Sequence, residues 1–206
     1  MTRGAQGDST REKTPTPRRL AKVRSVLARR QPGLTVVMEN IHDPHNVSAI
    51  FRTCDAVGVM RVELLYTNER FPKIGKKSSS SAQKWLDRRH HRSVEECFRT
   101  LRNEGFRICA TSIGPGVRSL YELDLTGRVA LVVGNEHRGV SDEAAKSADE
   151  VFQIPMMGMI ESLNVSVAAA VCLYETLRQR LVAGRYDVAE FDENEIARLS
   201  DDWLGR

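Results

Sequence analysis

The sequence lacks the long apolar stretch that a membrane-spanning or secreted protein would need. Its longest apolar run, Val165–Tyr174, is too short to cross a bilayer and is interrupted by a serine. The first residues are polar and contain no apolar core of the kind found in secretory signals. We therefore expect a cytoplasmic protein that does not associate with a membrane.

Cysteine is scarce, and no two cysteines have the CxxC spacing typical of zinc sites or redox motifs. Each of the four lies in a stretch of apolar periodicity, which indicates buried free thiols in a reducing compartment. His42 and His45 have no third ligand at a useful spacing, so we expect no metal site. The cysteines are Cys54, Cys97, Cys109 and Cys172.

The common phosphate-binding and nucleophile motifs are also absent. The chain contains no Walker A loop, no GxGxxG fingerprint and no GxSxG elbow. These absences argue against an NTPase, a dehydrogenase and a serine hydrolase. They also disfavour the broader alternative of a generic nucleotide-binding α/β protein.

Basic residues are in slight excess and are clustered. Lys and Arg total 31 against 27 for Asp and Glu, a formal net charge of +4 in 206 residues. The excess gathers at residues 18–30, 73–84 and 88–92. Such clusters are typical of surfaces that contact nucleic-acid phosphates, although a solvated protein face gives the same pattern. The length suits one α/β domain with short extensions.

Apolar periodicity divides the chain into four parts. Residues 1–16 are polar and expected to be disordered, and residues 17–33 form a basic helix that begins at Pro17 and ends at Pro32 and Gly33. Strand and helix patterns alternate over residues 34–184, which predicts a mostly parallel sheet with helices on both faces. Residues 185–206 form a helical extension with a capping box at Asp192 and Glu195.

Several loops should meet at one edge of this sheet. We expect strands at 34–38, 61–66, 85–88, 106–111, 129–133 and 151–154, and a long helix at about 164–183. In parallel sheets, ligands bind where loops leave the carboxyl ends of the strands. The loops in question begin at Glu39, Ser112, Gly134 and Pro155.

Three short blocks at these loops carry polar side chains. In the block 134–141, Gly134 either lets a ligand approach the backbone or makes a tight turn before Glu136. The block 154–164 holds three methionines, which suit the wall of a ligand pocket, and its polar end can cap the following helix. In the block 46–52, Arg52 lies off the apolar stripe of a helix, where a surface ion pair is the simpler interpretation.

Together the blocks resemble the SPOUT superfamily of RNA methyltransferases, in its TrmH branch. The matching motifs are NVSAIFRTCDAVGV at 46–59, LVVGNEHRGVS at 131–141 and IPMMGMIESLNVSVAAAV at 154–171, and the similarity covers about residues 34–181. The resemblance implies a deep trefoil knot near the carboxyl terminus, S-adenosylmethionine bound in the knot, and a homodimer. It implies an enzyme that methylates a ribose 2′-hydroxyl.

The sequence motifs indicate the reaction more specifically than they indicate the RNA substrate. The segment SSSAQKW, the basic amino-terminal helix and the helical extension resemble the enzymes that act on guanosine 18 in the D-loop of tRNA. Ribosomal RNA and the tRNA wobble position stay open as substrates, because relatives with these substrates share the motifs. A non-catalytic RNA-binding module on the same fold is the alternative from another class.

The resemblance also assigns roles to individual residues. Arg52 is implied as the general base, but a guanidinium stays protonated in proteins, so it can instead grip a phosphate and stabilise the alkoxide. The implied catalytic residues are Asn46, Arg52, Glu136, Ser162 and Asn164. The implied cofactor contacts are Thr111, Gly134, Ile154, Met159 and Leu163. From the basic clusters we expect tRNA contacts at Arg19, Lys22, Arg24, Lys76, Lys77 and Lys84.

Overall fold

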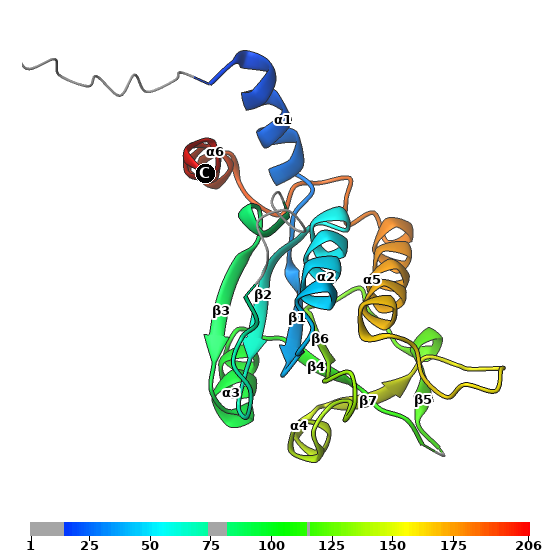
Figure 1. Ribbon diagram of the computed structural model, residues 1–206. Helices are drawn as coiled ribbons and strands as arrows, with labels where there is room; N and C mark the ends of the chain where they lie inside the picture. The colour runs from blue at the N-terminus through cyan, green and yellow to red at the C-terminus, as the bar shows by residue number, and fades with distance from the viewer. Residues whose placement is uncertain (1–14, 74–81, 115) are drawn as a thin grey trace, which may run out of the picture.

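The computed structural model describes residues 15–73, 82–114 and 116–206. Its centre is a seven-stranded sheet in the order β3-β2-β1-β6-β4-β7-β5, and every pair of neighbouring strands is parallel. This confirms the predicted parallel α/β architecture (Figure 1). The strands are β1 (Gln31–Glu39), β2 (Val59–Leu65), β3 (Asp87–His91), β4 (Arg107–Thr111), β5 (Arg118–Ser119), β6 (Val129–Val133) and β7 (Glu150–Gln153).

Helices cover both faces of the sheet, as the sequence predicts. One apolar core joins the sheet to α2 and α5, and a second joins its other face to α3 and α4. Strand β6 is apolar and buried at every position because it lies between these two layers. The helices are α1 (Pro17–Leu27), α2 (Pro44–Ala56), α3 (Val94–Asn103), α4 (Asp142–Ser147), α5 (Val165–Val182) and α6 (Glu193–Gly205), with short 3-10 turns η1 (Ala82–Lys84) and η2 (Leu120–Glu122).

The terminal helices α1 and α6 pack against each other and form a third, smaller core. Leu27 of α1 and Trp203 of α6 are almost fully buried there. The predicted capping box is present, with Asp192 and Glu195 exchanging hydrogen bonds at the start of α6. The extensions are therefore one packed unit, set beside the end of the sheet where β1 begins (Figure 1).

The buried guanidinium of Arg30 ties this unit to the main domain. It lies over the Trp203 ring, 5.0 Å from the ring centroid, and forms an ion pair with Asp55 of α2. It also donates a hydrogen bond to the Val59 carbonyl at 2.6 Å. Burial lowers the pKa of this guanidinium, and the neighbouring Asp55 carboxylate opposes that shift.

All four cysteines are buried and none forms a disulfide, which confirms the prediction of free thiols. Burial raises the pKa of Cys109 to about 11 and that of Cys172 to about 12. Burial likewise raises the pKa of Cys54 and Cys97 well above the ordinary range of a thiol. These thiols pack as small apolar side chains and carry no thiolate at neutral pH.

Two predicted boundaries are wrong. Helix α1 ends at Leu27, and Pro32 and Gly33 lie inside β1 rather than after a helix. The proline is tolerated because the pairing of β1 with β2 shifts register between Gln31 and Thr35, where its missing N–H interrupts no regular ladder. The predicted strand 85–88 also starts too early, since β3 begins at Asp87 after the η1 turn.

Several expectations remain predictions. Residues 1–14 of the expected disordered tail lie outside the described residues, and the trefoil knot and the four-part domain division are not tested by the strand pairing. Strand β5 was not expected, because it contains only two residues and has no apolar pattern. Across the described ranges, no helix combines the length and apolar character required to span a membrane.

We predict that Trp203→Ala destabilises the fold by about 3 kcal/mol, because it opens a cavity between α1 and α6 and removes the ring beneath Arg30. For a chain of this size, the melting temperature measured by circular dichroism should fall by roughly 6–12 °C. The control is Asp201→Ala, an exposed position on the same helix, which should change stability by less than about 0.5 kcal/mol. Equal melting temperatures for the two variants would contradict the role given to Trp203.

Candidate active site

The polar blocks meet at the carboxyl edge of the sheet. Strands β1 and β6 are neighbours, so the loops that follow Glu39 and Val133 leave the sheet side by side. The first loop leads into α2, which begins at Pro44 with Asp43 as its N-cap. The second contains Glu136, and the amino end of α5 faces the same region. The topology thus gathers three segments that are far apart in the sequence.

Glu136 is the acceptor that joins two of these segments. Its Oε1 atom accepts hydrogen bonds from the Asp43 backbone N–H at 3.0 Å and from Asn46 Nδ2 at 2.9 Å. Its Oε2 atom accepts one from the His42 backbone N–H at 3.0 Å. The carboxylate lies at the amino end of α2, where the helix dipole favours negative charge. It therefore fixes the start of α2 against the loop after β6.

Asn46 extends the connection to the third segment. Its side chain is largely buried, and its Oδ1 accepts a hydrogen bond from Asn164 Nδ2 at 3.1 Å. Asn164 is the N-cap of α5, and its Oδ1 accepts from the Ser166 backbone N–H at 2.9 Å. Each amide donates through its nitrogen and accepts through its oxygen. The hydrogen bonds of the series therefore run in one direction, from Asn164 through Asn46 to Glu136.

The environment of Glu136 keeps it ionised. Burial by itself raises the pKa of this carboxyl, but the hydrogen bonds from Asn46 and from the His42 and Asp43 amides outweigh it and hold the pKa below the ordinary value. Since the folded pKa is depressed, the stabilisation exists at neutral pH and is lost as the pH falls through that pKa. At neutral pH Glu136 acts as a hydrogen-bond acceptor and an orienting charge.

Arg52 is carried by the same helix as Asn46. It is exposed, six positions further along α2, while Val47 and Phe51 of this helix point into the core. The helix rise places it about 9 Å from Asn46 along the axis. An exposed cation on a helix anchored by Glu136 is well placed to meet an anionic substrate from solvent.

The tight loop after β6 requires a glycine at position 134. A Cβ atom at this position would lie 2.0 Å from the Gly139 carbonyl carbon, an impossible contact. The turn is closed by mutual backbone hydrogen bonds between Asn135 and Gly139, at 2.9 and 2.8 Å. This observation supports the tight-turn interpretation of the sequence and leaves a cofactor contact at Gly134 as a prediction.

The methionine-rich loop projects from the domain. Met157 and Met159 are 94% and 100% exposed, and Ile160 is 66% exposed. Ser162 is also exposed, whereas Leu163 is half-buried. In the single chain these side chains do not form the enclosed pocket wall that the sequence predicted, so the assigned roles of Met159 and Ser162 stay predictions.

Three of the expected cofactor contacts lie at the ends of adjacent strands. Thr111 ends β4, Gly134 follows β6, and Ile154 follows β7, and these strands are neighbours in the order β6-β4-β7. Thr111 donates a hydrogen bond to the Val132 carbonyl, and both Thr111 and Ile154 remain partly exposed. Gly134 is buried beneath its own turn, so a flat or extended ligand along this edge can reach Thr111 and Ile154, and a contact at Gly134 stays a prediction.

Sequence reasoning missed a second layer of polar residues beneath the site. Asn135 donates to the Asn40 carbonyl at 2.8 Å and to Glu69 at 3.3 Å. Glu69 also pairs with Arg138 at 2.5 Å. Asn40 has a φ of 50°, a left-handed conformation that asparagine tolerates better than most residues. An asparagine directly after a buried strand was the available signal for this layer.

The expected RNA contacts have different surroundings. Arg19 and Lys22 are exposed on α1 and Lys84 is exposed on η1, whereas Arg24 is half-buried and paired with Glu193 at 2.6 Å. Lys76 and Lys77 lie outside the described residues. No group of three potential metal ligands occurs in the described parts of the chain.

Comparison with known proteins agrees with this geometry. The family model described as the SpoU rRNA methylase family matches residues 33–174. A relative from Thermus thermophilus, named tRNA (guanosine(18)-2′-O)-methyltransferase, is 46% identical over 94% of this chain and 98% of its own length.

Solved structures show the same fold. The Aquifex aeolicus protein described as a TrmH/SpoU tRNA modifying enzyme aligns with a TM-score of 0.86 at 38% identity, covering 91% of this chain and 95% of that one. The Streptomyces viridochromogenes methyltransferase AviRb, solved in complex with AdoMet, aligns with a TM-score of 0.66 at 28% identity over 74% of this chain and 62% of its own. The matched model spans most of the chain and contains all three polar blocks, and the chain therefore belongs to the SpoU methylase family.

Proposed function

We propose that this protein is an S-adenosylmethionine-dependent methyltransferase that modifies the ribose 2′-hydroxyl of guanosine 18 in tRNA. The observation that carries the proposal is the hydrogen-bonded series Glu136–Asn46–Asn164, with Arg52 exposed on the same helix. Because the proposed substrate is tRNA, we place the enzyme in the cytoplasm.

The choice of guanosine 18 rests on the extent of the similarity. The Thermus thermophilus relative with that activity in its name matches 94% of this chain and 98% of its own length. A Vibrio parahaemolyticus relative named for 23S rRNA matches 77% of this chain at 32% identity, and a structure described for methylation of C/U34 on tRNA covers 73% of it at 29% identity. The intact polar series likewise argues against a non-catalytic RNA-binding module.

S-adenosylmethionine, when bound, supplies an activated methyl group. We assign its binding to Thr111, Gly134, Ile154, Met159 and Leu163. The first three lie along one edge of the sheet, and the AdoMet complex of AviRb shows that a family member binds this cofactor. The task left to the protein is alignment of the ribose, since positioning dominates when the group to be transferred is already activated.

Arg52 has the central role toward the substrate. Its guanidinium can hold a phosphate beside the modified ribose and stabilise the negative charge that develops on the 2′-oxygen. The proton of that hydroxyl then passes to the phosphate or to water. Asn46 and Asn164 hold the ribose through their amides, Ser162 adds a hydroxyl, and Glu136 keeps Asn46 in place.

The basic helix α1 supplies contacts that do not depend on sequence. Arg19 and Lys22 are exposed and suited to tRNA phosphates. Arg24 contributes less charge, because it pairs with Glu193. Lys84 on η1 extends the proposed contact surface, and Lys76 and Lys77, which lie outside the described residues, stay expected contacts.

We also propose that the enzyme is a homodimer. Exposed apolar side chains occur on the projecting loop, at Met159 and Ile160, and on α5, at Val167 and Tyr174, which are 48% and 54% exposed. Val167 and Tyr174 are seven positions apart and share one face of the helix. An apolar surface of this kind is typical of a protein–protein interface.

Glu136→Gln is predicted to lower kcat about 10- to 100-fold. The glutamine amide leaves only one acceptor oxygen for three donors. The lost hydrogen bonding costs about 1–3 kcal/mol, and a transition-state barrier raised by that amount slows the reaction by about this factor. Transfer of labelled methyl groups to unmodified tRNA measures the rate. Glu143→Gln, a matched change at an exposed position of α4, should leave kcat unchanged. An equal effect at both positions would remove Glu136 from the site.

Replacement of Arg52 distinguishes its two possible roles. Arg52→Ala should lower kcat more than about 100-fold under either role, because the site loses the positive charge that contacts the substrate. Arg52→Lys keeps the charge and should retain measurable activity with little dependence on pH near neutrality. An activity that rises about tenfold per pH unit in Arg52→Lys would indicate a general base, and complete loss of activity would contradict a purely electrostatic role.

The dimer is tested by light scattering. The parent chain should have twice the mass of one chain, and Val167→Glu with Tyr174→Glu should reduce it to the single-chain mass, because buried unpaired carboxylates are costly. Tyr121→Glu, at an exposed aromatic outside this surface, is the control and should stay dimeric. A monomeric parent chain would refute the proposal.

A further inference from the structure

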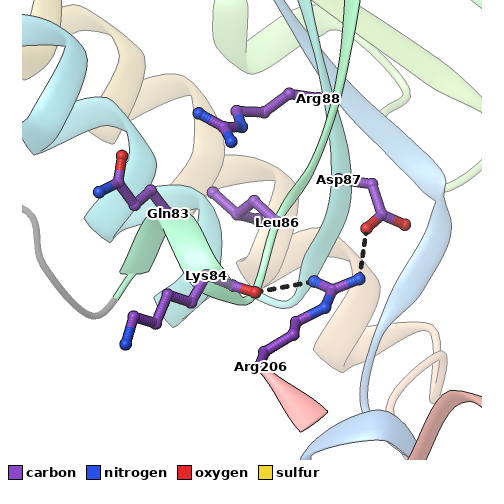
Figure 2. A pocket seen from close by; sticks show the side chains of 6 residues that line it. All are labelled: Gln83, Lys84, Leu86, Asp87, Arg88 and Arg206. Atoms are coloured by element: carbon purple, nitrogen blue, oxygen red, sulfur yellow. Dashed lines mark hydrogen bonds and ion pairs between the residues drawn. The ribbon is translucent and has the colours of Figure 1, made fainter. Parts of the chain in front are cut away.

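A cavity of about 450 Å³ lies at the opposite end of the sheet from the active site. Its lining comes from η1, from the start of β3 and from the end of α6 (Figure 2). The lining residues are Gln83, Lys84, Leu86, Asp87, Arg88 and Arg206. The three motif blocks at 46–59, 131–141 and 154–171 contribute nothing to it, whereas Gln83 and Lys84 belong to the segment SSSAQKW and Lys84 is one of the expected tRNA contacts.

The cavity has one ionic bridge built into its wall. Arg206 pairs with Asp87 at 2.9 Å and with Asp202 at 2.7 Å, and it donates to the Lys84 carbonyl at 2.7 Å. Figure 2 shows this guanidinium joining the two sides of the cavity below Leu86. These contacts use the only carboxylate of the lining, so Asp87 does not neutralise the other cations.

Two exposed cations remain available for a ligand. Lys84 and Arg88 are both exposed, and within the described residues neither side chain has a carboxylate partner. The amide of Gln83 adds two more donors. A lining with a surplus of donors and of positive charge suits an oxyanion, and a phosphate diester is an oxyanion of this kind.

The position of the cavity indicates how large the ligand must be. The cavity lies where β3 begins, whereas the polar series lies beyond the carboxyl ends of β1 and β6. Strand β1 has nine residues and spans about 30 Å at the usual rise per residue. A ligand that contacts both places must be a macromolecule. The cavity also adjoins the basic helix, since Arg19 of α1 donates to the Leu204 carbonyl near Arg206.

We infer that this cavity binds a backbone phosphate of the tRNA at a distance from the modified ribose. This inference rests on the proposed function and extends it with a second anchoring site. Lys84 and Arg88 contact the phosphate backbone directly, and Arg206 holds η1 and β3 in the geometry that presents them. The site adds affinity for the folded RNA and takes no part in methyl transfer.

The test compares a double variant, Lys84→Gln with Arg88→Gln, against the parent chain. Filter binding gives the Kd for unmodified tRNA as a function of salt, and methyl transfer gives KM and kcat. The control pair, Lys146→Gln with Arg99→Gln, removes the same two charges from exposed positions on α4 and α3. A second variant, Lys84→Arg with Arg88→Lys, keeps both charges in place.

The cavity variant should raise Kd and KM about tenfold and lower the salt slope by about 2, with kcat at saturating tRNA unchanged. The control pair should behave like the parent, and the charge-preserving variant should retain most of the affinity. If the charge-preserving variant loses its affinity for tRNA, the two side chains support the structure rather than contact the phosphate. That result would overturn the inference.

Other results would also overturn it. If Kd and the salt slope do not change, the cavity serves a different ligand, such as an acidic protein segment. If kcat falls while Kd is unchanged, the residues act on catalysis rather than on anchoring. A parent chain that binds tRNA but does not methylate it would refute the proposed function while leaving the binding test valid.

Discussion

The hydrogen bonds accepted by Glu136 are the interaction on which the site depends. This carboxylate lies in the loop after β6 and accepts from two backbone amides and one side chain at the start of α2. The buried face of α2 sets the rotation of that helix, and Glu136 adds the link between its amino end and the loop after β6. Because Asn46 and Arg52 share that helix, the same acceptor ties both of them to this loop.

The terminal helices are connected to the same helix from the other end. Arg30 stacks on Trp203 of α6 and pairs with Asp55, one turn beyond Arg52. Helix α2 is thus held at its amino end by Glu136 and near its carboxyl end by Arg30. An RNA that contacts α1 and α6 would therefore rest on elements joined through Arg30 to the helix that carries Asn46 and Arg52.

Much of this organisation could be predicted from the sequence, for physical reasons that differ between elements. The apolar run of β6 and the capping residues of α5 and α6 are local signals, and the structure confirms them. The grouping of Asn46, Glu136 and Asn164 followed from the family motifs and is observed as hydrogen bonds. The prediction that Pro32 ends a helix was wrong, because the place of this proline in β1 depends on a register shift with β2. No local sequence pattern reveals that shift.

The residues that could not be predicted depend on contacts between distant segments. The bond from Asn135 to the Asn40 carbonyl, the pairing of Glu69 and the bridge made by Arg206 each join parts of the chain far apart in sequence. The pocket wall that the composition around Met159 predicts is not tested by the single chain, in which Met159 is 100% exposed, so that role stays a prediction.

The complete burial of the cysteines has a practical consequence. Their thiols lie inside the core and titrate far above neutral pH, so maleimides and iodoacetamides should leave the native protein unmodified. A cysteine introduced on the surface would then be the single reactive thiol of the molecule. Dyes or spin labels can be attached to α1 or beside the Arg206 cavity without removal of native residues, and the path of a bound RNA can be followed by distance measurements.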